Sequence, residues 1–331
     1  MINVLAVLAL VGVTIGVAAL PLWPALRELR HPRDTAPLDI ADVDYGDIRS
    51  AAERLTTILA EQPLDTLAHT LVPLGPGIEG RRISLPAPHT DVLLATEAEA
   101  VRDVTLSEHA VLYSTARVVA LSDSRLPALY ATQWARLEPG TAILAWAFAD
   151  VLIAGAGVQL AGTADAASAI HLHPGVQFER VRAPKVYIGD AMQAPRPLSP
   201  STGKRPRHLI QGDLDIPSGS VLDGDYVVHG TTTLSDDVTI NGALKSYGPI
   251  TTGARCTVTH ALMTEQHLTL GPDNTLGGPV LAETHLDAAP GLQVGSASSL
   301  ATLSASTIAL RPTSRVYGTV WAKDGGKVVA A

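Results

Sequence analysis

The second half of the chain repeats with a period of eighteen residues, and this period limits the folds that are open to it. Aliphatic residues mark four successive steps of the repeat, at Leu222, Ile240, Val258, Leu276 and Val294. Such a regular repeat is typical of a solenoid, in which each coil buries its apolar face only against the neighbouring coils. The repeat therefore predicts a stack of similar coils.

Within each repeat the apolar positions come in pairs two residues apart, which is the alternation of a β-strand. Turn-forming residues such as Gly271, Pro272 and Asp273 separate these short strands. Eighteen residues divided among three sides predict an all-β, triangular β-helix with coils about 4.8 Å apart. Val294 and Val316 are twenty-two residues apart, so one turn is expected to carry a four-residue insertion.

Two residues of the inward columns are unusual. Cys256 is the only cysteine, and we expect it to pack inside the solenoid as a small apolar side chain. Asn274 occupies the same column one coil later and is a polar exception. A single cysteine cannot form an intramolecular disulfide, which is compatible with a reducing compartment.

Residues 91–190 show the same pattern less regularly. Ile143, Leu160 and Phe178 are seventeen and eighteen residues apart, and an insertion interrupts the register near residues 122–127. These features predict a second, irregular β-solenoid segment that precedes the regular one.

The N-terminal residues 1–24 are predicted to form a transmembrane anchor. The stretch 2–22 is almost wholly apolar, which is enough to span a bilayer as a helix. A cleaved signal peptide, and export to the envelope surface, is the rival interpretation, but no Lys or Arg precedes the apolar run. Arg27, Arg30 and Arg33 follow it, so the positive-inside rule predicts an inner-membrane protein with the bulk of the chain in the cytoplasm.

The remaining segments connect or flank these parts. Residues 25–90 are predicted to be a juxtamembrane stalk with a short helix at 45–61, where Ile48, Ala52, Leu55, Ile58 and Leu59 have helical spacing. Residues 191–208 form a linker rich in Pro, Ser and basic residues, and its Lys204, Arg205, Arg207 and His208 could touch lipid, contact an acidic partner or simply be solvated.

The regular β-helix occupies 209–322, and 323–331 is a predicted tail. No capping helix is visible after Val320, so the last coil should expose strand edges that can pair with another chain.

The net charge of −8 argues against nucleic acid as a partner, because phosphate binding needs clustered Lys and Arg. The E-x-H sequences at 265–267 and 283–285 would stack on adjacent coils and could bind a metal ion, but an outward, solvated ladder is the simpler interpretation. His171 and His173 should likewise face solvent. No phosphate loop, nucleophile elbow or zinc motif is present, so we assign no catalytic, cofactor-binding or metal-binding residue.

The segment 209–322 resembles the bactofilins, the polymer-forming cytoskeletal proteins of bacteria. The likeness lies in GDLDIPSGSVLDGDYVV (212–228), in the repeated turn phrases and in VYGTVWA (316–322). The resemblance implies a right-handed triangular β-helix that polymerises end to end into non-polar filaments without nucleotide. It also implies a membrane-associated scaffold for envelope-building enzymes.

The leading hypothesis is thus a membrane-anchored structural scaffold, not an enzyme, that self-associates through its β-helix and organises envelope or cell-shape machinery. Its expected partners are other copies of itself, the membrane and envelope-synthesis proteins. The alternative is a hexapeptide-type acyltransferase or a ligand-binding solenoid. The large side chains of Tyr226, Leu244, Leu262 and Val280 disfavour the left-handed coil of such transferases, which wants a small residue there.

Overall fold

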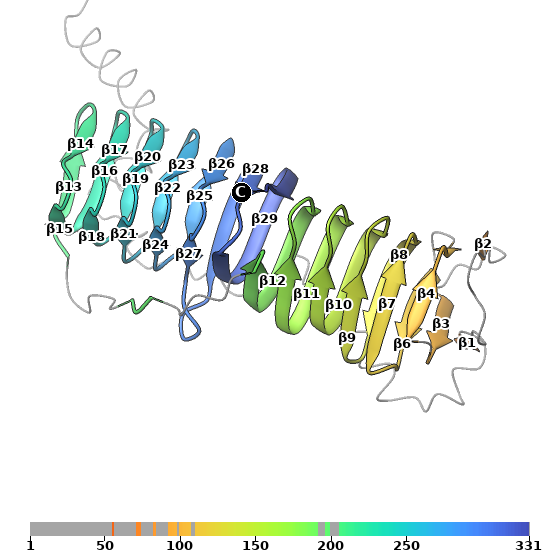
Figure 1. Cartoon of the computed structure of the whole chain (residues 1–331). Helices are drawn as coiled ribbons and strands as arrows, with labels where there is room; N and C mark the ends of the chain where they lie inside the picture. The colour runs from red at the N-terminus through yellow and green to blue at the C-terminus, as the bar shows by residue number, and fades with distance from the viewer. Residues whose placement is uncertain are drawn as a thin grey trace, which may run out of the picture. The chain divides into compact units, whose positions relative to one another are not determined.

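The computed structural model describes Leu55 and residues 71–73, 82–83, 92–97, 99–106, 110–190, 196–198 and 205–330. All of these residues belong to one compact unit, Ile48–Ala331. They form a β-solenoid of about 12 turns, which confirms the all-β solenoid predicted from the repeat. Figure 1 shows two groups of coils, called here the first stack (residues 71–188) and the second stack (residues 207–328).

The first stack is built from the strands β1 (Leu71–Pro73), β2 (Arg82–Ile83), β3 (Val92–Thr96), β4 (Ala100–Arg102), β5 (Thr105–Leu106), β6 (Ala110–Ser114), β7 (Val118–Ser122), β8 (Arg125–Ala131), β9 (Trp134–Leu137), β10 (Ala142–Ala154), β11 (Gln159–Leu172) and β12 (Gln177–Ile188). Its coils vary in length. Val101 lies beside Leu121, twenty residues on, whereas Ile143 pairs with Leu160, seventeen residues on.

The first stack also begins earlier than the sequence indicated. β1 pairs with β3, and β2 pairs with β5, in parallel. Both strands lie in the segment 25–90 that was predicted to be a stalk, so residues 71–73 and 82–83 of this segment belong to the solenoid. Its many Pro and Gly residues concealed two strands of only three and two residues.

The second stack consists of β13 (Arg207–Ile210), β14 (Leu214–Ile216), β15 (Val221–Asp223), β16 (Asp225–Val228), β17 (Thr232–Leu234), β18 (Thr239–Asn241), β19 (Leu244–Ser246), β20 (Ile250–Thr252), β21 (Thr257–Val258), β22 (Leu262–Thr264), β23 (Leu268–Leu270), β24 (Thr275–Leu276), β25 (Val280–Ala282), β26 (His285–Ala288), β27 (Gln293–Val294), β28 (Ala301–Leu310) and β29 (Ser314–Val328). Each coil has three sides, and each side is a series of parallel strands that begins with β13–β16, β14–β17 or β15–β18.

The register of these series confirms the eighteen-residue coil. Leu222 lies beside Ile240, and Ile240 lies beside Val258. The longer step from Val294 to Val316 is also a register pair, and its additional residues lie in the turn between β27 and β28. The predicted insertion is therefore a surface loop that leaves the stacking intact.

The core of both stacks is a narrow column of aliphatic side chains. Ile240, Leu262 and Leu276 are fully buried in the second stack, and Leu129 and Leu152 are fully buried in the first. Cys256 is free and fully buried, as expected for its inward column, and burial raises the pKa of its thiol. An aliphatic column suits a parallel solenoid because each buried side chain contacts its counterparts in the coils above and below it.

One turn of every coil adopts a left-handed backbone conformation. φ is positive at Gly219, Asp237, Arg255, Asp273 and Gly291, which follow one another at eighteen-residue intervals. Glycine adopts this conformation freely, and aspartate tolerates it better than most residues. The same turn therefore defines one corner along the whole second stack.

The two stacks meet through their C-terminal coils. β12 and β29 lie side by side (Figure 1) and pair in the antiparallel sense. Val181 lies beside Val320, and both of these side chains are fully buried. The expectation of an uncovered C-terminal coil was therefore wrong. β29 runs to Val328, well into the segment predicted to be a tail, because strand pairing with β12 continues to Lys327.

The predicted anchor at 1–24 lies outside the described residues, and so does the predicted helix at 45–61 except for Leu55, which is helical. Within the part of the chain that the structure describes, no helix has the length and hydropathy needed to span a bilayer.

Replacing Gly277 with alanine should destabilise the solenoid. A Cβ atom there would lie 2.2 Å from the carbonyl oxygen of Thr259 in the preceding coil. Two hydrogen-bonded coils would have to move apart, so we expect the free energy of unfolding to fall by about 1–3 kcal/mol. Chemical denaturation measures the loss. Thr269→Ala, at an exposed position, is the control and should change the free energy by less than about 0.5 kcal/mol; equal losses in both variants would contradict the close approach.

Candidate functional site

The two E-x-H sequences do not assemble a metal site. In 265–267 and 283–285 both histidines are exposed, and so is Glu283. Glu265 forms an ion pair with Lys245, whose Nζ lies 2.9 Å from Oε1. Among the described residues no group of three metal-binding side chains comes together. The sequences thus form part of the outer surface between coils.

Two histidines of the outer surface pack against neighbouring coils. His285 Nδ1 lies 2.8 Å from Thr307 Oγ1. His171 is less open to solvent than the sequence indicated, because it stacks on Tyr187 with ring centroids 4.8 Å apart. Burial lowers the pKa of His171, and the neighbouring His173 lowers it further. Both contacts join adjacent coils.

The basic residues at the end of the predicted linker separate in the structure. Arg207 is exposed, whereas His208 stacks on Tyr226 at a centroid distance of 4.7 Å. Arg205 turns toward the second stack and forms an ion pair with Asp225 at 2.9 Å. Lys204 lies outside the described residues. The three described residues therefore have different surroundings and do not form one basic patch.

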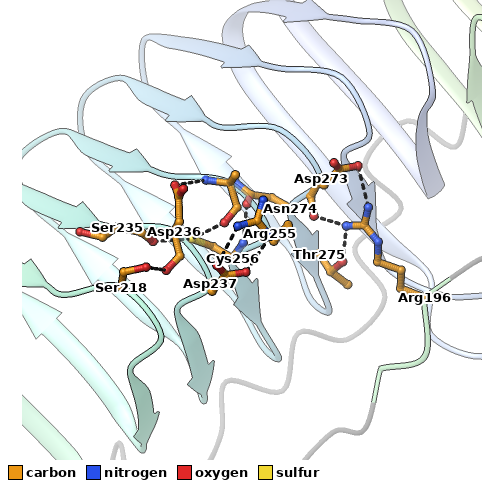
Figure 2. A network of polar contacts seen from close by, with 11 residues as sticks. Arg196, Ser218, Ser235, Asp236, Asp237, Arg255, Cys256, Asp273, Asn274 and Thr275 are labelled. Atoms are coloured by element: carbon orange, nitrogen blue, oxygen red, sulfur yellow. Dashed lines mark hydrogen bonds and ion pairs between the residues drawn. The ribbon is translucent and has the colours of Figure 1, made fainter.

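Arg196 fastens the connector (residues 189–206) to the turns of the second stack (Figure 2). Its backbone N–H donates to Gln293 Oε1 at 2.8 Å, and its carbonyl oxygen accepts a hydrogen bond from Gln293 Nε2 at 3.0 Å. Its guanidinium donates to Asp273 Oδ1 at 2.7 Å and also to the carbonyl oxygen of Asp273. Backbone and side chain of one residue thus hold the connector against two coils.

Asp273 belongs to a polar ladder along the left-handed corner (Figure 2). Arg255 donates from two nitrogens to the carboxylate of Asp237, each at 2.7 Å, and this hydrogen bonding lowers the pKa of Asp237. The carboxylate of Asp236 accepts the Ala254 N–H at 2.8 Å. Such contacts between coils offset the strain of the positive φ angles.

The hydrogen bonds of Asn274 explain why a polar residue stands in the inward column. Its Oδ1 accepts the backbone N–H of Cys256 at 2.7 Å, and its Nδ2 donates to Thr252 Oγ1. A buried N–H without a partner would cost about 1–3 kcal/mol, so the amide serves the backbone of the coil beneath it.

The junction of β12 with β29 carries two cation–π contacts that run in opposite directions. The guanidinium of Arg180 on β12 lies 4.4 Å from the centroid of Trp321 on β29. The guanidinium of Arg315 on β29 lies 5.4 Å from the ring of Tyr187 on β12. The backbone register places the same residues opposite each other. The junction is thus specified by side chains as well as by strand pairing.

The N-terminal end of the second stack has no covering strand in the part of the chain that the structure describes. Among the described residues, β13, β14 and β15 pair on one side only, with β16, β17 and β18. Leu209 and Val221 at this end are 59% and 66% exposed. Leu222 is only partly buried, whereas Ile240, its counterpart in the next coil, is fully buried. We call residues 207–223 the open coil, because its strand edges and part of the apolar core are exposed among the described residues.

A second apolar cluster lies on the outside of the first stack. Leu55, the described residue of the predicted helix 45–61, packs against it. Aromatic rings of successive coils stack within it, at centroid distances of 5.6 and 5.1 Å. Burial raises the pKa of its Tyr113, and Tyr130 contributes to the rise. The cluster is formed by Val111, Tyr113, Ala128 and Tyr130, with Trp146 and Phe148 partly buried beside them.

The chain matches no protein-family model, no curated protein sequence and no solved structure. Its fold therefore rests on its strand pairing, and its function must be argued from the open coil, the junction and the connector.

The junction and the contacts of Arg196 with the second stack were not predicted from the sequence. Both contacts join segments that are far apart in the chain, and neither repeats. One signal was present: Trp321 is a large aromatic residue at an outward position, where neighbouring coils carry Ser304, Leu281 and Met263.

A double-mutant cycle should detect the junction in solution. We expect Arg180→Ala and Trp321→Ala to be coupled by about 0.5–1 kcal/mol in the free energy of unfolding, because the two side chains form a half-exposed cation–π pair. Chemical denaturation of the four proteins gives the coupling. Arg136 pairs with Glu138 and lies away from Trp321, so Arg136→Ala should show none. Zero coupling for Arg180 would mean that the stacks do not meet in this register.

Proposed function

We propose that this chain is a structural scaffold that self-associates through the open coil of its second stack. The observation that supports the proposal is that, among the described residues, the three strands of this end each pair on one side only, with apolar side chains 59% and 66% exposed at Leu209 and Val221. Edges of this kind are templates for pairing with another chain, and natural proteins usually cover or charge them. A second copy of this chain carries the same strand edges and can therefore pair with them.

The junction restricts how copies can join. Because β12 and β29 cover each other, a second copy cannot add its open coil to the C-terminal end of the second stack. Two open coils would instead meet edge to edge about a two-fold axis, which makes the interface isologous. Strands related in this way run antiparallel across the contact, as β12 and β29 do within the chain.

The proposed location is the cytoplasmic face of the inner membrane. The apolar stretch 2–22 and the arginines at 27, 30 and 33 support a single-pass anchor with the solenoid in the cytoplasm. The anchor would confine assembly to the membrane surface. In this proposal the coil is right-handed, as the resemblance to the bactofilins implies, and the assembly positions envelope-synthesis or cell-shape proteins.

The alternative of an acyltransferase or ligand-binding solenoid stays a prediction. It would use His267 or His285 as a base, and both rings are exposed on the outer surface. That position does not favour a bound substrate, so no specific observation raises this function above the scaffold.

Lysine at the rim of the open coil should weaken self-association. We expect the full-length protein in detergent to associate with increasing concentration, and Leu209→Lys or Val221→Lys to weaken association on the order of tenfold or more, because a charge would be buried at the contact. Sedimentation velocity and electron microscopy measure the effect.

Leu300→Lys is the matched control, because Leu300 is also 59% exposed but lies in the turn between β27 and β28. It should assemble like the wild type. A wild-type protein that stays monomeric at every concentration would refute the scaffold proposal.

The anchor predicts an intact N-terminus in the native protein. A membrane anchor stays attached to the chain, whereas a signal peptide is removed from the mature protein. Mass spectrometry of the native protein should therefore find residues 1–20 in place. A chain that lacks them would move the solenoid out of the cytoplasm.

A further inference from the structure

The connector ends against a corner of the second stack where Gly224 and Gly242 leave no room for a side chain at their own positions. A Cβ atom at Gly242 would lie 1.8 Å from the carbonyl oxygen of Gly224, and one at Gly224 would lie 2.6 Å from the carbonyl oxygen of Pro206. The Pro206 carbonyl accepts the backbone N–H of Asp225 at 2.8 Å. The glycines thus let the end of the connector lie close to the corner.

Arg205 spans this corner and contacts two coils at once. Its Nε donates to Asp225 Oδ1 at 2.9 Å, and its Nη1 lies 2.7 Å from His260 Nε2. The guanidinium and the carboxylate are only 26% and 33% exposed. One side chain therefore ties the last residues of the connector both to β16 and to the coil that contains His260.

The hydrogen bonds determine the protonation state of His260. A guanidinium has donors and no acceptor, so His260 Nε2 must offer its lone pair to Arg205. The proton of the neutral ring then sits on Nδ1, which lies 2.9 Å from Thr259 Oγ1 and donates to it. A second proton on Nε2 would remove the acceptor and place two positive charges together.

The charged groups that face His260 are Arg205 from the connector and Asp225 from β16. The corner positions of the flanking coils are Gly242 and Gly278, which carry no side chain. Burial lowers the pKa of His260 and Arg205 lowers it further, while Asp225 opposes the shift.

Partial burial alone would raise the pKa of Asp225, but hydrogen bonds from the Ala243 N–H and from Arg205 lower it. Asp225 therefore stays ionised while His260 titrates.

We propose that Arg205, Asp225 and His260 form a proton-sensitive latch, which holds the end of the connector and strand β13 on the second stack at neutral pH and opens on acidification. Arg205 lies two residues before Arg207, where β13 begins, so release of Arg205 removes one of the contacts that hold β13. The pairing of β13 with β16, the hydrogen bond from the Asp225 N–H to the Pro206 carbonyl and the stacking of His208 on Tyr226 remain. β13 carries Leu209 at the rim of the open coil. Opening of the latch therefore loosens part of the open coil and weakens self-association in acid. This consequence for assembly rests on the proposed function.

The direction follows from the lowered pKa of His260. The folded chain binds this proton less readily than the unfolded chain, so the contribution of the latch is complete well above the ordinary histidine pKa of about 6.5. It declines as the pH falls below that value and is lost once the pH has passed the lower pKa of the folded state.

Amide hydrogen exchange of the full-length protein tests the latch directly. Peptides that cover 205–210 would be followed by mass spectrometry from about pH 7.5 to about pH 5, with correction for the intrinsic pH dependence of exchange. Protection should fall by about tenfold for each unit by which the fold lowers the pKa of His260. His260→Gln should keep its protection throughout, because a glutamine Oε1 accepts from Arg205 at every pH.

Two further variants complete the test. Arg205→Gln should lose protection of 205–210 already at neutral pH, and His267→Gln, at an exposed histidine, should behave like the wild type. If the wild type and His260→Gln share one pH dependence, the latch is refuted. Nuclear magnetic resonance that shows His260 titrating at or above the ordinary value would refute it as well.

Exchange and sedimentation separate the latch from the scaffold. A chain that stays monomeric while protection of β13 follows His260 would refute self-association and leave the latch intact. If the wild type and His260→Gln each assemble to the same extent at about pH 7.5 and about pH 5, the latch does not control assembly.

Discussion

The unpaired edge of a β-strand is the constraint on which this molecule depends. Every coil inside a stack covers the edges of its neighbours, but the first and last coils cannot be covered in this way. The chain meets the problem at two of its four stack ends by pairing β12 with β29. The antiparallel junction, the returning connector and the contacts of Arg196 are consequences of this arrangement, because the second stack must begin far from β12 in order to end beside it.

The repeat made the second stack predictable from the sequence. Leu222, Ile240 and Val258 mark the same position of successive coils. Because this position is inward in each coil, one atypical residue does not hide the pattern of inward side chains. The junction occurs once and has no period. Nothing in the sequence around Val181 and Val320 indicates that two such ordinary aliphatic residues lie beside each other, so the end of the solenoid was wrongly expected to be uncovered.

The candidate site was predictable only in part. The sequence drew attention to Arg205 as a basic residue, but its contact with His260 crosses fifty-five residues and depends on glycines that bring the connector close. Periodicity indicates which positions share a column, and it is silent about segments that leave the stack and return. For the same reason Asn274 stood out as an exception whose purpose, the backbone N–H of Cys256, was visible only in three dimensions.

The junction also imposes an order on biosynthesis. A ribosome makes Ile188, the last residue of β12, one hundred and twenty-six residues before Ser314, the first of β29. At roughly 5–20 residues per second, β12 waits on the order of ten seconds for its partner strand. During that time its edge is available to any other nascent chain. A message that ends early would leave that edge permanently open, so incomplete copies of this chain carry an adhesive surface that the finished protein has closed.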